Sequence, residues 1–258
     1  MERASALQLL LGRERPAVIA GIAGAIALSW AYLVAASRDM SGAMDGVSAW
    51  MMAATWDGRY TALVFAMWFV MMIGMMLPSA APAILIYARV LNNSAQAERP
   101  VARTYAFIAG YLLAWAGFSL AATLLQLALA RAALLSPMMV SASPALGGVV
   151  LIAAGLYQFT PLKQACLTQC RGPVAFLTQN FRPGVGGALR LGAHHGLYCV
   201  GCCWALMLLL FFGGVMSLLW IAAITVFVLL EKLAPLGAQG GKLSGALLIA
   251  SGLWVAAA

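Results

Sequence analysis

The chain has 258 residues, of which 64% are hydrophobic and only 9% are charged. Soluble domains carry about 25% charged residues, so this composition excludes a water-soluble globular protein and indicates a protein embedded in a lipid bilayer. The formal net charge of +8 does not indicate a nucleic-acid partner, because the basic residues lie in short segments between apolar runs.

Seven apolar runs follow one another along the chain, most of them near the roughly 20 residues with which a helix crosses a bilayer. Their hydrophobic residues are continuous and do not alternate, which argues against barrel strands. We therefore predict a single integral membrane domain over residues 1–258, an all-α polytopic bundle of about seven transmembrane helices. The predicted spans are residues 17–36, 61–88, 104–130, 145–161, 191–213, 215–231 and 243–258.

The distribution of lysine and arginine predicts the orientation of the bundle. With a cytoplasmic N-terminus, the inner segments hold twelve of the 15 basic residues, and only Arg38, Arg59 and Arg131 fall in outer segments. Cytoplasmic loops carry this excess of positive charge in membrane proteins. The first span is longer than the apolar part of a signal peptide, and we expect it to be retained as a helix.

The second predicted span is too long for one straight helix and contains Pro78 and Pro82, so we expect a kink or a break there.

The second predicted span also holds a stripe of methionines spaced by four, which includes Met71 and Met75, with Met72 and Met76 in a second stripe beside it. Thioethers are soft ligands that suit Cu(I), but methionine is also a flexible packing residue. Both interpretations are open, as they are for Met40, Met44, Met51 and Met52 in the first outer loop.

The fifth predicted span contains two histidines and three cysteines within ten residues, namely His194, His195, Cys199, Cys202 and Cys203. At 100° per residue, all of them except His194 share one face of a helix. Imidazole and thiolate are the main protein ligands of soft and borderline metals, and ionisable groups inside a membrane segment usually have a function. The alternative is packing, because free cysteine behaves as a small hydrophobic residue.

A second pair of cysteines, Cys166 and Cys170, lies in the predicted cytoplasmic loop before the fifth span. A separation of four places both thiols on one side of a short helix. The reducing cytoplasm makes a structural disulfide unfavourable there. If this loop folds back under the fifth span, the two cysteine groups meet and form one site.

Four blocks of this sequence, Met71–Pro78, Pro161–Pro173, His195–Trp204 and Val228–Lys232, resemble a bacterial family of unknown function described as predicted metal-binding integral membrane proteins. Some members of that family are labelled copper chaperones. The resemblance covers about residues 60–235 and implies metal binding and residence in the bacterial inner membrane.

The acidic residue of the last block, Glu231, is open to three interpretations: an anchor at the membrane interface, a hard metal ligand, or a partner that orients His195. Its neighbour Lys232 is expected to extend toward the interface.

We predict a protein that handles Cu(I) and delivers it, with a metalloenzyme under assembly as its partner. Three ligands on one helix suit the low coordination number of Cu(I), whereas zinc favours a closed site of four ligands; a haem held by His194 or His195 is a further alternative. Two other functions are open: a membrane thiol–disulfide oxidoreductase built on Cys199 and Cys202, and an accessory subunit of a larger membrane complex. No nucleophile–base arrangement favours an ordinary enzyme.

Overall fold

A computed structural model describes residues 15–41, 57–92, 99–134, 143–234 and 237–257. Within these ranges the chain is helical and contains no strand, which confirms the predicted all-α class. A helix occupies each of the seven predicted spans. The helices are α2 (Arg15–Ser41), α4 (Gly58–Asn92), α5 (Pro100–Arg131), α6 (Pro144–Gln158), α7 (Pro161–Arg171), α8 (Pro173–Asn180), α9 (Gly184–Leu208), α10 (Leu210–Gly213), α11 (Leu218–Leu233) and α12 (Gly237–Ala257).

Five of these described segments are long and apolar enough to cross a membrane: α2, α4, α5, α9 together with α10, and α12. The pair α6 and α7 gives a sixth if it counts as one span, although its two helices are bent by 65° at the break. The predicted number of about seven also included α11, which has 16 residues. The architecture is that of a polytopic membrane bundle.

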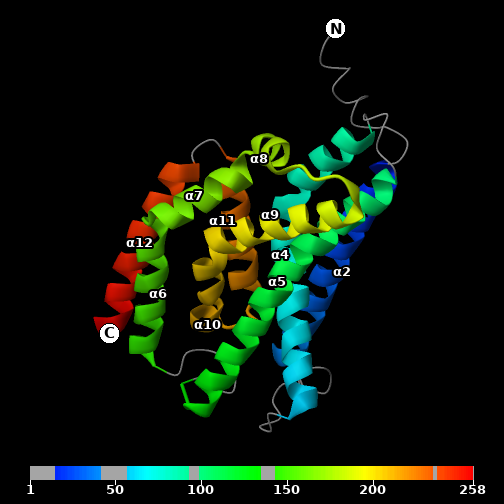
Figure 1. The fold of residues 1–258 in the computed structure, drawn as a ribbon. Helices are drawn as coiled ribbons and strands as arrows, with labels where there is room; N and C mark the ends of the chain where they lie inside the picture. The colour runs from blue at the N-terminus through cyan, green and yellow to red at the C-terminus, as the bar shows by residue number, and fades with distance from the viewer. Residues whose placement is uncertain (1–14, 42–56, 93–98, 135–142, 235–236, 258) are drawn as a thin grey trace.

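The short helices α7 and α8 lie across one end of the bundle (Figure 1). The end of α4 and the start of α5 reach the same end, and α2 begins there, whereas α12 ends at the opposite side. Most of the cations that the sequence assigns to the cytoplasm therefore belong to elements at one end. That this end faces the cytoplasm stays a prediction.

Helix α4 runs through both of its prolines without a break, so of the predicted kink or break only a kink is compatible with the structure. A proline inside a helix lacks the N–H that would donate to the carbonyl four residues earlier, and in a membrane that carbonyl needs another donor. The carbonyl that Pro78 leaves without its backbone donor belongs to Gly74. It accepts a hydrogen bond of 3.1 Å from Nε1 of Trp30 on α2. A side chain of the neighbouring helix thus replaces the missing donor and stabilises the continuous helix.

Helices α5 and α9 pack with their backbones in close contact, because glycines lie where they cross. A Cβ atom on Gly110 would lie 1.9 Å from the carbonyl oxygen of Leu189, and one on Gly192 would lie 1.9 Å from that of Phe107. Small residues permit this approach between membrane helices. The contact fixes the position of α9, which carries the histidines and three of the cysteines.

Replacing Gly110 with alanine should lower the free energy of unfolding by about 1–3 kcal/mol, since the added methyl group has no room. Gly117 on the same helix is the matched control, because nothing lies within 4 Å of a Cβ atom placed there. The G117A variant should unfold at an unchanged or slightly higher temperature, since alanine is the better helix former. Thermal unfolding in detergent measures both, and equal stability of the two variants would contradict this packing.

Candidate metal site

The cysteine face of α9 points into the bundle. Cys199 and Cys202 are each 1% exposed and Cys203 is fully buried. Gly192 and Gly196, at which α9 meets α5, lie on the two turns before Cys199, so the tight helix crossing also places these thiols in the interior. Lipid is therefore kept away from the polar groups of this face.

Helix α7 packs against α9 and brings the second cysteine pair to the first. The Cys170 sulfur lies 3.9 Å from the Cys202 sulfur. Cys166 is buried one turn earlier on α7, where its sulfur would be 2.7 Å from a Cβ atom on Gly201. The loop thus folds back as the sequence analysis required, and it presents Cys170 to the thiols of α9 and Cys166 to the glycine.

A methionine of α4 completes the group of sulfur atoms. The Met76 sulfur lies 3.8 Å from the Cys203 sulfur. Met71 and Met75, which the sequence favoured as soft ligands, are fully buried in the core of the bundle. We call the five residues with adjacent sulfurs on α4, α7 and α9 the sulfur cluster: Met76, Cys170, Cys199, Cys202 and Cys203.

A lysine reaches this cluster from the end of α11. The Lys232 ammonium donates hydrogen bonds to the Cys199 sulfur at 2.9 Å and to the Ser79 hydroxyl at 3.1 Å. The residue is 6% exposed, so the expectation that it extends toward the membrane interface is wrong. A positive charge beside a thiol stabilises the thiolate, which is the form that binds metals.

A tyrosine of α5 contacts the same cysteine from another side. The Tyr111 hydroxyl donates to the Met76 carbonyl at 3.0 Å and lies 3.0 Å from the Cys199 sulfur. It thereby joins α5, α4 and α9 at the cluster. Nothing in the sequence marks this tyrosine, since it is one aromatic residue among many in a long apolar run.

A buried ion pair lies at the start of α7, on the same helix as the second cysteine pair. The Lys163 ammonium is 2.6 Å from an oxygen of Glu231, with side-chain exposures of 0% and 1%. The same ammonium donates to the side-chain oxygen of Gln158. Glu231 is therefore neither an interfacial anchor nor the partner of His195; it binds α11 to α7.

The two histidines are placed apart from the sulfur contacts. His195 is 3% exposed and packs among aromatic rings, 5.0 Å from Phe176 and 6.0 Å from both Phe107 and Tyr111 between centroids. Its Nδ1 atom has no hydrogen-bond partner among the described residues. His194 points elsewhere, as predicted, and packs on Tyr198 at 4.8 Å.

The described ranges contain no group of three or more His, Cys, Asp or Glu side chains that could hold a metal ion by themselves. Within the sulfur cluster, the Cys199 side chain contacts those of Cys170, Cys202 and Cys203, and the Met76 thioether lies against Cys203. The predicted ligands Cys170, Cys199, Cys202 and Cys203 lie together, whereas the prediction for Met44, Met51 and Met52 falls outside the described residues, and nothing is described of the Met40 side chain.

Comparison with protein families relates the chain to a described family. The family model of PpoB2, described as a copper chaperone, matches residues 65–255. The matched region begins within α4 and includes all five residues of the sulfur cluster, together with Tyr111, His195 and Lys232. No curated protein and no solved structure matches the chain.

Proposed function

This chain belongs to the PpoB2 copper-chaperone family, and on that premise we propose that it is an integral protein of the bacterial inner membrane that binds Cu(I) through the sulfur cluster and delivers it to a metalloenzyme. Copper is the cargo of such a protein. The observation that carries the proposal is the meeting of thiols and a thioether from three helices in a buried position. Thiolates and thioethers are the soft ligands that select Cu(I).

The distances between the sulfur atoms support this proposal. Metal–sulfur bonds of about 2.3 Å, at angles between tetrahedral and trigonal, separate two sulfurs that share an ion by about 3.8–4.0 Å. The pair Cys170–Cys202 is at 3.9 Å and the pair Cys203–Met76 is at 3.8 Å. Both pairs could therefore bind an ion between them without a large movement of the helices.

The charge near the cluster also favours Cu(I). One Cu(I) ion with two thiolates carries a single net negative charge, which is unfavourable in a low-dielectric interior unless it is paired. The Lys232 ammonium, 2.9 Å from the Cys199 sulfur, supplies the matching positive charge.

Met76 should contribute to copper binding more than the methionines that the sequence favoured. Replacing Met76 with leucine removes one sulfur atom and nearly conserves the volume of the side chain. We expect about tenfold weaker Cu(I) binding, because even the loss of a residue that only contacts a metal ligand lowers metal affinity by about that factor. Competition with a coloured Cu(I) chelator, without oxygen and in mild detergent, measures this affinity. Met71→Leu is the matched control from the same helix and should bind as the unchanged protein does. Equal affinity of the two variants would contradict the role of Met76.

A thiol–disulfide oxidoreductase remains a second candidate, because the Cys170 and Cys202 thiols are free and adjacent. Copper, zinc and iron quantified together in the purified protein separate the two functions. Copper that protects these thiols from alkylation supports the chaperone. Stoichiometric zinc without copper contradicts it, and a metal-free protein that exchanges disulfides with a small thiol favours the second candidate.

A further inference from the structure

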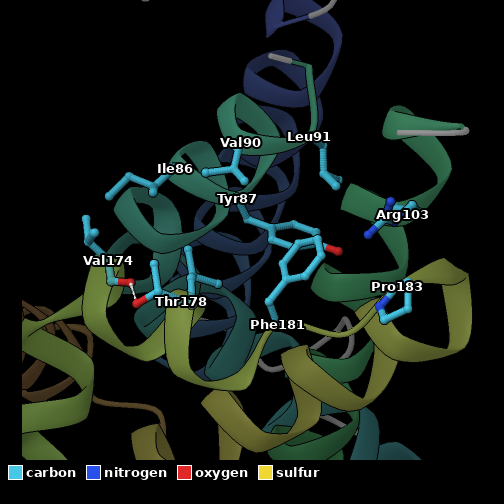
Figure 2. Close-up of a pocket in the computed structure, with 10 residues that line it drawn as sticks. Ile86, Tyr87, Val90, Leu91, Arg103, Val174, Thr178, Phe181 and Pro183 are labelled. Carbon is cyan, nitrogen blue, oxygen red and sulfur yellow. Dashed lines mark hydrogen bonds between the residues drawn. The ribbon is translucent and has the colours of Figure 1, made fainter. Parts of the chain in front are cut away.

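A cavity of about 480 Å³ lies between the end of α4, the start of α5 and α8, away from the sulfur cluster. Figure 2 shows the side chains that line it. Its wall is mainly apolar, with Ile86, Val90 and Leu91 from α4 and Val174 and Leu177 from α8. It reaches the surface where Val90, Val174 and Phe181 are each more than 40% exposed.

Two polar groups in this apolar wall have no hydrogen-bond partner. Arg103 is only 6% exposed, and its Nε and Nη2 atoms are buried without a partner among the described residues. The hydroxyl of the fully buried Tyr87 has no hydrogen bond of good geometry either; its polar neighbour is the Arg103 guanidinium, which cannot accept the hydroxyl proton. Figure 2 shows this hydroxyl pointing toward the guanidinium. Buried polar groups are almost always paired, so both donors need an acceptor.

The contacts that hold Arg103 do not neutralise its charge. Its guanidinium carbon lies 5.5 Å from the centroid of the Phe181 ring, and Phe107 is stacked on Tyr87 at 4.9 Å. A ring face attracts a cation only modestly and accepts no strong hydrogen bond. Among the described residues, no carboxylate lies within salt-bridge distance of Arg103; the salt bridge found there joins Lys163 and Glu231.

We propose that this cavity binds an anionic amphiphile, whose carboxylate or phosphate group pairs with Arg103 and Tyr87 and whose hydrocarbon chain lies along the apolar wall. A guanidinium presents several donors in a planar arrangement that matches an oxyanion. The cavity volume is in the range of small-molecule sites. It lies at the end of the bundle that the sequence assigns to the cytoplasm, where basic pockets between helices bind acidic lipid head groups.

The test measures binding of radiolabelled oleate to the delipidated full-length protein in nonionic detergent. Arg103→Gln should weaken oleate binding about tenfold or more, the scale of a charge-assisted hydrogen bond. Arg103→Lys should retain most of it. Arg190→Gln removes an exposed cation of α9 and is the matched control, which should bind as the unchanged protein does. Tyr87→Phe removes only the hydroxyl and tests the site again if R103Q does not fold.

Competitors identify the natural source of the anion. Displacement of oleate by phosphatidylglycerol indicates a membrane phospholipid, and its absence indicates a free fatty acid; both outcomes support the site. Displacement by inorganic phosphate alone, or equal binding of oleyl alcohol, would overturn it, as would unchanged affinity in R103Q and Y87F. Copper loading of the same variants is measured in parallel and should be unchanged, so this site and the copper site can fail separately.

Discussion

Replacing Cys170 and Cys202 together with serine should weaken Cu(I) binding by at least about a hundredfold, more than the loss of an outer partner of a metal site typically does. The two sulfurs come from different helices and lie 3.9 Å apart, so the double substitution removes a thiol from each of the two helices that meet at the cluster. Serine keeps the size of the side chain but replaces a soft sulfur with a hard oxygen, which Cu(I) binds poorly. Chelator competition without oxygen measures the change.

Cys166→Ser is the matched control for this experiment. Cys166 lies on the same short helix as Cys170 and is also buried, but its sulfur lies against Gly201. The C166S variant should therefore bind copper as the unchanged protein does. Copper retained by the double variant, or lost equally in C166S, would contradict a site built on Cys170 and Cys202.

The part of the site that lies on one helix could be predicted from the sequence. The spacing of Cys199, Cys202 and Cys203 places them on one face, and the cost of exposing polar groups to lipid turns that face inward. Met76 could not be chosen in this way. It meets Cys203 across 127 positions of the chain, and the methionine stripes of α4 gave no reason to prefer it over Met71 or Met75.

The predicted roles of Glu231 and Lys232 at the membrane interface were wrong because, as for Met76, contacts with distant parts of the chain decide where these side chains lie. A charged pair at the end of an apolar run is typical of a membrane interface, and the sequence assigned Glu231 and Lys232 accordingly. The structure brings α7 against the end of α11, which buries both residues and supplies each with a partner. Local hydropathy carries no information about which loop covers a helix end. Helix α4 likewise stays unbroken because of a residue on another helix: Trp30 supplies the hydrogen-bond donor that Pro78 lacks.

Replacing Glu231 with glutamine should lower the free energy of unfolding by about 3–5 kcal/mol, the loss typical of breaking a buried ion pair from one side. The Lys163 ammonium is fully buried and would keep only the neutral side-chain oxygens of Gln158 and of the new glutamine. Unfolding in detergent, followed by circular dichroism, measures the change. We expect this to be the most destabilising of the single substitutions considered.

The double variant Lys163→Met with Glu231→Gln distinguishes an unpaired charge from lost packing. It removes both charges, and replacing a buried pair with neutral groups is often neutral or stabilising, so most of the lost stability should return. A double variant as unstable as E231Q would contradict this account and assign the effect to the shape of the side chain.

The ion pair also joins α7, which carries Cys170, to α11, which carries Lys232. Because the double variant keeps the fold without this link, its Cu(I) affinity shows whether the ion pair positions the copper ligands or only stabilises the bundle.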